Sequence, residues 1–209
     1  MATLSRQQIR DAIVQADKRF ASVVEAVGLP PTRRPAAVDE RFGALIRSIT
    51  FQLLATAAAN TIHARVTDAC GGTISPESVL AAGAERLKAA GLNRAKSEAM
   101  VALAERVAAQ DIHLDRHGRM DDAAIVKELT VVKGVGPWTV QMYLMHTLGR
   151  RDVWPVGDYG VRMGWTILHD LPEMISERDL KAEGDPFTGV RSDVAWYCWQ
   201  AVHLARNAK

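Results

Sequence analysis

Cysteine is scarce in this chain: Cys70 and Cys198 are the two among 209 residues. No Cys-x-x-Cys pair occurs, which argues against a zinc ribbon, an iron–sulfur cluster and a disulfide framework. We therefore expect both cysteines to be reduced, buried thiols in a cytosolic protein.

Long hydrophobic runs are also missing. No stretch of about 18 apolar residues occurs, so the sequence predicts no membrane-spanning helix and no membrane partner. The first fifteen residues, MATLSRQQIRDAIVQ, are polar and amphipathic and do not have the pattern of a signal peptide.

A strong excess of one charge is the third absence. The chain has 26 basic and 24 acidic side chains, which gives a net charge of +2. Such a balance does not by itself indicate a nucleic-acid-binding protein. If the chain binds DNA, its positive charge must be local and backbone groups must contribute to binding.

The residues that are present favour helices. Ala, Leu, Arg, Glu and Lys dominate, and alternating β-branched runs are almost absent, which predicts an all-α fold. Hydrophobic residues make up 48% of the chain, enough for one large domain or two small lobes. Residues 29–37 contain three prolines and two arginines and are typical of a linker. We expect an N-terminal helical segment and linker over 1–35 and the main domain over 36–209.

The expected helices begin and end at recognisable signals. Ser5 and the Ser75-Pro76 pair are typical helix starts. Gly91 separates two further helices. Helices are expected near 40–53, 55–69, 83–90, 94–110, 121–129, 138–148, 158–169 and 190–206, with 170–189 irregular or briefly helical.

The segment LTVVKGVGPW, residues 129–138, joins two helical patterns through a glycine-rich turn. Gly134 and Gly136 permit a tight turn with bare backbone N–H groups, and Val135 can point inward. Such N–H groups, with the start of the next helix, bind phosphate without reading sequence. Lys133 strengthens that interpretation, although an ordinary turn between two helices with glycine caps has a similar pattern. No strand precedes the turn and a third glycine is missing, so it is not a dinucleotide fingerprint.

From Leu129 to Arg162 the sequence resembles the helix-hairpin-helix/Gly-Pro/Asp superfamily of DNA glycosylases, and within it the 3-methyladenine DNA glycosylase II group. The resemblance extends over roughly residues 40–205. It implies a two-lobed all-α fold with the hairpin at 121–148 and a cleft between the lobes. It also implies a monomer that repairs double-stranded DNA containing a damaged base, in a bacterial-type cytoplasm, at the nucleoid.

The same resemblance assigns catalysis to Asp158, which lies 22 residues after Gly136. Asp158 is equally suited to cap the helix that follows it, and both roles can hold at once. In relatives with lyase activity a lysine follows the hairpin and forms a Schiff base; here that position is Trp138. The resemblance therefore implies monofunctional hydrolysis of the N-glycosidic bond of alkylated bases in base excision repair.

The chemistry suits a single carboxylate. A base alkylated on a ring nitrogen is already cationic and leaves without a general acid. A pocket for it needs aromatic faces, because cation–π attraction favours charged rings. We assign Trp138, Trp154 and Tyr159 to this pocket, with a core position as the alternative for Trp138 and Trp154. Three other tryptophans lie in amphipathic helices and are expected in the core: Trp165, Trp196 and Trp199.

DNA contacts are expected from two segments. By resemblance, Gln52 and Leu53 enter the duplex, where a leucine can fill the space left by an extruded base. The remaining predicted DNA-binding residues are Lys133, Gly134, Val135, Gly136 and Arg162. Arg150 and Arg151 are further candidates for phosphate contacts.

No cofactor is expected to be required. The resemblance implies a possible Na⁺ or K⁺ held by the backbone carbonyls of Thr130, Val132 and Val135. Two alternatives stay open: a glycosylase for another lesion or mismatch, and a non-catalytic helix-hairpin-helix DNA-binding module. Replacing Asp158 with Asn separates them, because an enzyme would lose base release and keep its DNA affinity.

Overall fold

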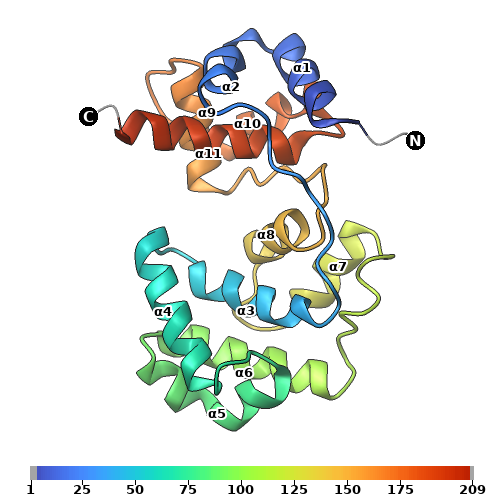
Figure 1. The fold of residues 1–209 in the computed structure, drawn as a ribbon, viewed down its shortest axis with the longest axis vertical. Coiled ribbons are helices and arrows are strands. Elements are labelled where there is room, and N and C mark those ends of the chain that lie inside the picture. The colour runs from blue at the N-terminus through green and yellow to red at the C-terminus, as the bar shows by residue number, and fades with distance from the viewer. Residues whose placement is uncertain (1–3, 208–209) are drawn as a thin grey trace. The chain divides into compact units, whose positions relative to one another are not determined.

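The computed structural model describes residues 4–207, and every regular element in that part of the chain is helical (Figure 1). This confirms the all-α prediction. The elements are α1 Arg6–Ala16, η1 Lys18–Phe20, α2 Ala21–Val27, α3 Glu40–Phe51, α4 Thr56–Ala69, α5 Pro76–Ala89, α6 Arg94–Ala108, α7 Asp122–Leu129, α8 Pro137–His146, α9 Tyr159–Leu168, α10 Glu177–Glu183, η2 Asp185–Phe187 and α11 Arg191–Asn207. Within residues 4–207, no helix has the length and apolar character needed to cross a membrane.

Helix starts follow the capping signals. Ser5 caps α1 and Ser75 caps α5, each in a capping box whose two hydrogen bonds are both formed. The boundary expected near residue 83 is present as a break inside α5. Gly83 has a φ of 67° and a ψ of 166°, which are not helical, and two helical stretches meet at this kink.

The chain divides into two compact units. Unit 2 runs from Arg34 to Gly149 and contains α3 to α8. In this unit α5 and α6 pack side by side, and α3 contacts α4, α6 and α8 (Figure 1). Fully buried side chains, among them Leu45, Ile49, Met100 and Leu103, form its core.

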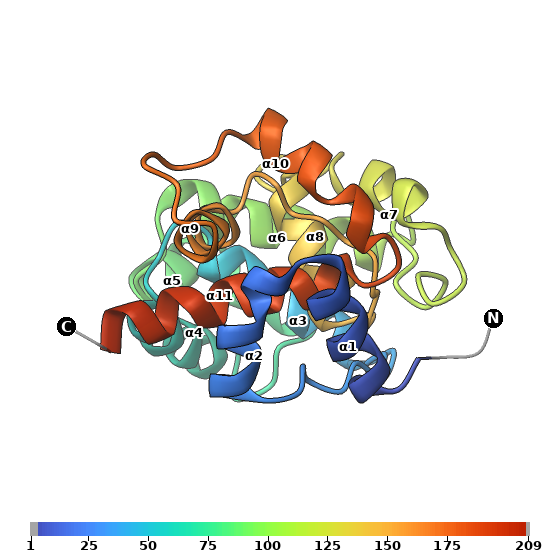
Figure 2. The same ribbon diagram turned by 90° about the horizontal axis from the view of Figure 1, so that it is seen from above.

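Unit 1 combines the residues up to Arg33 with those from Arg150 onward. Figure 2 shows α2 lying beside α11. Phe20 meets Trp165 and Phe187 edge to face, with ring centroids 5.8 and 5.7 Å apart, and the Tyr197 hydroxyl donates to the Gly28 carbonyl at 2.9 Å. The division therefore differs from the expected boundary at residue 35. The N-terminal helices complete the aromatic core of the C-terminal ones.

The chain passes from one unit to the other twice, at residues 33–34 and at residues 149–150. Within unit 2 the two connecting segments lie side by side. The Ala36 N–H donates to the Thr147 carbonyl at 2.7 Å. Gly149 has a φ of 66°, and a Cβ there would lie 3.1 Å from the backbone of Arg34. Only glycine meets both requirements.

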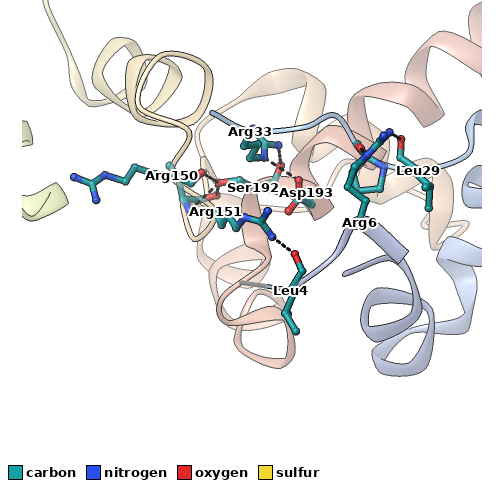
Figure 3. Close-up of polar contacts among 10 residues, drawn as sticks. Leu4, Arg6, Leu29, Arg33, Arg150, Arg151, Ser192 and Asp193 are labelled. Carbon is teal, nitrogen blue, oxygen red and sulfur yellow. Dashed lines mark hydrogen bonds and ion pairs between the residues drawn. The ribbon is translucent and has the colours of Figure 1, made fainter. Parts of the chain in front are cut away.

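On the unit 1 side, both passages are fastened to the first turn of α11 (Figure 3). Arg33 donates through Nε to Asp193 Oδ1 and through Nη2 to the Ser192 carbonyl, both at 2.8 Å. The Ser192 hydroxyl donates to the Arg150 carbonyl, also at 2.8 Å. Two segments more than a hundred residues apart in sequence are therefore bound to the same pair of residues, Ser192 and Asp193, which we call the anchor.

Candidate functional site

The hairpin lies in unit 2 between α7 and α8, at the predicted position. Val135 is buried, as expected, and its N–H closes the turn on the Val132 carbonyl at 2.9 Å. Gly134 has a φ of 93°, and a Cβ at that position would approach the Ala99 side chain of α6 to 2.8 Å. Both the backbone conformation and the close contact with α6 therefore require glycine.

Gly136 is under no comparable constraint. It caps α8 with a φ of −94°, and a Cβ added at this position would meet no atom within 4 Å. Lys133 and Gly134 are exposed, so the turn presents a cation and backbone to solvent. This arrangement suits a phosphate group.

Gln52 is at the C-cap of α3 and contacts the hairpin directly. Its Nε2 donates to the Gly134 carbonyl at 2.9 Å and to the Thr139 hydroxyl at 2.8 Å. The predicted DNA contact of Gln52 stays a prediction. In this structure its side-chain amide holds the α3–α4 loop against the hairpin.

Leu53 follows Gln52 and is fully exposed, with a φ of 54°. Left-handed backbone is unfavourable for a leucine, so neighbouring contacts must maintain it. Lys96 of α6 provides two of them: its Nζ donates to the Thr50 carbonyl at 2.9 Å and the Gln52 carbonyl at 2.6 Å. Burial lowers the pKa of Lys96.

The sequence interpretation missed Lys96. A signal was present, because the lysine shares a helix face with Ala99, Met100 and Leu103, which are buried. A lysine on an apolar face requires acceptors for its ammonium group. The carbonyls at the end of α3 supply them.

Asp158 lies in unit 1 and caps α9, as predicted. Its Oδ1 accepts the Val161 N–H at 2.8 Å, and the residue is only 8% exposed. The carboxylate therefore lies where the unpaired N–H groups of a helix start favour negative charge.

Trp199 of α11 donates its Nε1–H to the same Asp158 oxygen at 2.8 Å. The expectation that Trp199 is a core residue is therefore wrong: its side chain is half-buried and bonded to the predicted catalytic carboxylate. The adjacent Cys198 is buried, and burial raises the pKa of its thiol far above the ordinary value, with the Asp158 charge adding to the effect. Both cysteines are free and buried, as expected.

The three predicted pocket aromatics have different surroundings. Tyr159 is exposed at the first position of α9, and Trp138 is half-buried in the first turn of α8. Trp154 is buried, donates its Nε1–H to the Leu180 carbonyl at 2.8 Å and meets Trp165 edge to face. Of the two positions considered for Trp154, the pocket and the core, the structure shows the second: Trp154 lies in the core of unit 1. Trp165 is buried, as expected, whereas Trp196, which was also expected in the core, is half-buried.

Arg162 is half-buried, and its Nε donates to the Ile175 carbonyl at 2.8 Å, within unit 1. Arg151 donates to the Leu4 carbonyl at 3.1 Å (Figure 3). These contacts fix the two side chains to their own unit. Their phosphate contacts stay predictions.

Comparison with known proteins assigns this chain to a family. Residues 46–186 match the description "HhH-GPD superfamily base excision DNA repair protein", and the chain belongs to that superfamily. Among curated proteins it is similar to DNA-3-methyladenine glycosylase 1 of Schizosaccharomyces pombe, with 29% identity over 92% of this chain and 86% of that protein. It is also 30% identical to DNA-3-methyladenine glycosylase of Saccharomyces cerevisiae, over 74% of this chain and 55% of that protein.

Solved structures of similar proteins lead to the same family. The 3-methyladenine DNA glycosylase of Schizosaccharomyces pombe, in complex with abasic DNA, superposes with a TM-score of 0.86 at 28% identity, covering 94% of this chain and 98% of that one. The DNA-3-methyladenine glycosidase of Bacillus halodurans gives a TM-score of 0.77 at 28% identity, covering 95% and 91%. The fold and the family are therefore those of DNA glycosylases.

Proposed function

We propose that this chain is a monofunctional DNA glycosylase, of the 3-methyladenine DNA glycosylase II type, that releases alkylated bases from double-stranded DNA. The observation that carries the proposal is the Asp158 carboxylate, fixed by the Val161 N–H and the Trp199 indole at the start of α9. The names of two similar proteins, a DNA-3-methyladenine glycosylase and a DNA-3-methyladenine glycosidase, support alkylated bases as substrates. A monomer suffices, because one chain carries both the hairpin and the carboxylate.

The reaction needs little acid assistance. In an alkylated purine the ring already carries positive charge, so the C1′–N bond breaks with its electron pair passing to the base. The sugar then becomes an oxocarbenium-like cation, which the Asp158 carboxylate stabilises. Water adds at C1′ and loses a proton to the carboxylate or to solvent.

The nucleotide must leave the duplex before the carboxylate can reach its sugar, and extrusion costs a few kcal/mol. Leu53 is the side chain suited to fill the vacated space, and the hairpin at Lys133–Gly136 would hold the backbone. Trp138 stands where lyase relatives have a lysine, so no Schiff base forms and the strand stays intact.

We expect the carbonyls of Thr130, Val132 and Val135 to hold a Na⁺ or K⁺, since oxygen donors suit hard cations. Val132 already accepts the Val135 N–H, but a carbonyl has a second lone pair. A bound ion would add positive charge to the phosphate-binding turn. It is not required by the chemistry at Asp158.

Asp158→Asn tests the proposal, because the amide oxygen can still cap α9 and accept the indole N–H. On methylated duplex DNA, we expect base release to fall by at least about 10²- to 10³-fold while DNA affinity is kept. Chromatography identifies the freed bases, and denaturing gels detect strand cleavage.

Each outcome separates the alternatives. Release of alkylated bases with intact strands supports the proposal, and β-elimination would contradict monofunctional hydrolysis. Release only from mismatched or oxidised substrates would indicate a different lesion. Tight DNA binding by the natural chain without release of any base would indicate a DNA-binding module.

A further inference from the structure

The Asp158 carboxylate receives two N–H donors on one oxygen, and they differ in origin. The Val161 N–H belongs to the helix that Asp158 itself caps, at 2.8 Å. The Trp199 indole comes from α11, 41 residues further along the chain, and also lies at 2.8 Å. Capping of α9 requires only the Val161 N–H contact. The hydrogen bond from the Trp199 indole is not needed for capping and therefore needs another explanation.

Two glycines of α9 make room for this contact. A Cβ on Gly160 would lie 2.7 Å from Cδ1 and 3.0 Å from Nε1 of the Trp199 ring. A Cβ on Gly164 would overlap the backbone carbonyl of Cys198, the residue before Trp199. At Gly164 the backbone of α9 therefore lies directly against the backbone of α11, and at Gly160 the missing side chain leaves room for the indole beside Asp158.

We propose that Trp199 is a positioning residue that fixes the orientation of the Asp158 carboxylate for glycosidic bond cleavage. An indole N–H can only donate, so it requires the facing oxygen to act as an acceptor. Its ring is rigid and wedged by α9, so the donor does not reorganise as charge develops on the sugar. This inference rests on the proposed function and extends it to a residue outside the hairpin and the aspartate loop.

Trp199→Phe removes the donor and keeps an aromatic ring, and Gly160→Ala drives a methyl group into the indole. In single-turnover assays we expect each variant to lower the rate of base release by about 10- to 100-fold, as a displaced catalytic group does, with DNA affinity unchanged. Trp196→Phe is the matched control. It changes a half-buried tryptophan of the same helix that contacts Tyr197 instead, and it should keep the natural rate.

A measurement without substrate separates this inference from the proposed function. In ¹⁵N-labelled protein, the Trp199 indole signal, assigned by its loss in Trp199→Phe, should shift in Asp158→Asn while the Trp196 signal stays in place. If the natural chain releases no base but this shift occurs, the proposed function fails and the contact stands. An unmoved Trp199 signal, or a folded Trp199→Phe that releases bases at the natural rate, would overturn the positioning role.

Discussion

At the scale of single residues, Leu53 combines two unfavourable features, a left-handed backbone and a fully exposed apolar side chain. Leu53→Gly should remove both. We expect the free energy of unfolding to rise by about 0.5–1 kcal/mol, because glycine has no Cβ penalty at positive φ. Base release should fall about tenfold or more, because nothing then fills the space left by the extruded base. Urea denaturation and release assays on the same preparations measure both changes.

Gln110→Gly is the control for this prediction. Gln110 has a φ of 61°, is exposed and follows α6, so it shares the backbone strain of Leu53 without its position beside the hairpin. It should gain similar stability and keep full activity. If Leu53→Gly also keeps full activity, Leu53 is not the residue that enters the duplex.

Single residues also show where the sequence was informative. Asp158 could be singled out because the sequence from Leu129 to Arg162 resembles a family motif in which the aspartate follows the hairpin at a fixed sequence spacing. Trp199 could not, because its periodicity in α11 is that of a core residue and nothing in its neighbourhood points to Asp158. The contact depends on the approach of two helices, and the only sequence trace of that approach is the spacing of Gly160 and Gly164.

At the scale of elements, the hairpin offers a matched pair of substitutions. Gly134→Ala should destabilise the protein by about 1–3 kcal/mol, since alanine is strained at a φ of 93° and its Cβ would press on Ala99. Gly136→Ala meets no atom within 4 Å at an ordinary φ, so it should cost roughly 0.5 kcal/mol or less. Thermal and urea unfolding give both values. Equal losses at the two positions would show that the packing against α6 does not limit the turn.

The elements themselves were predictable where capping signals were strong. Asp121 caps α7 and Asn93 caps α6, close to the expected starts. Helix α10, capped by Ser176, lay in a stretch expected to be irregular or briefly helical. It has seven residues with a single buried side chain, Leu180, so it has too little apolar periodicity to be recognised.

At the scale of the whole molecule, the sequence could locate the linker near residues 29–37 but not the partner of the segment before it. Proline content marks where a chain is extended, whereas the packing of α2 with α11 is a long-range contact. The net charge of +2 likewise does not indicate whether the chain binds DNA. The groups predicted to bind phosphate, Lys133 and the backbone of Gly134, lie together in one exposed turn, which a whole-chain charge sum does not register.

The anchor at the first turn of α11 gives a prediction for the whole molecule. The Arg33 and Asp193 side chains are 4% and 2% exposed, and burial raises the pKa of Asp193 although Arg33 opposes the rise. Arg33→Met leaves a buried carboxylate without this partner, and should lower the free energy of unfolding by about 3–5 kcal/mol. Arg10→Met is the control, since its pair with Asp11 is exposed and should matter little.

Tryptophan fluorescence makes the effect specific to one unit. Four of the five tryptophans, Trp154, Trp165, Trp196 and Trp199, lie in unit 1, and Trp138 alone lies in unit 2. Because Arg33 and Asp193 both belong to unit 1, the fluorescence transition of Arg33→Met in urea should move to lower denaturant further than the circular dichroism transition, which reports helices of both units. If the two transitions move together, the anchor stabilises both units as one cooperative structure. If neither moves, the buried ion pair does not hold the two chain passages in place.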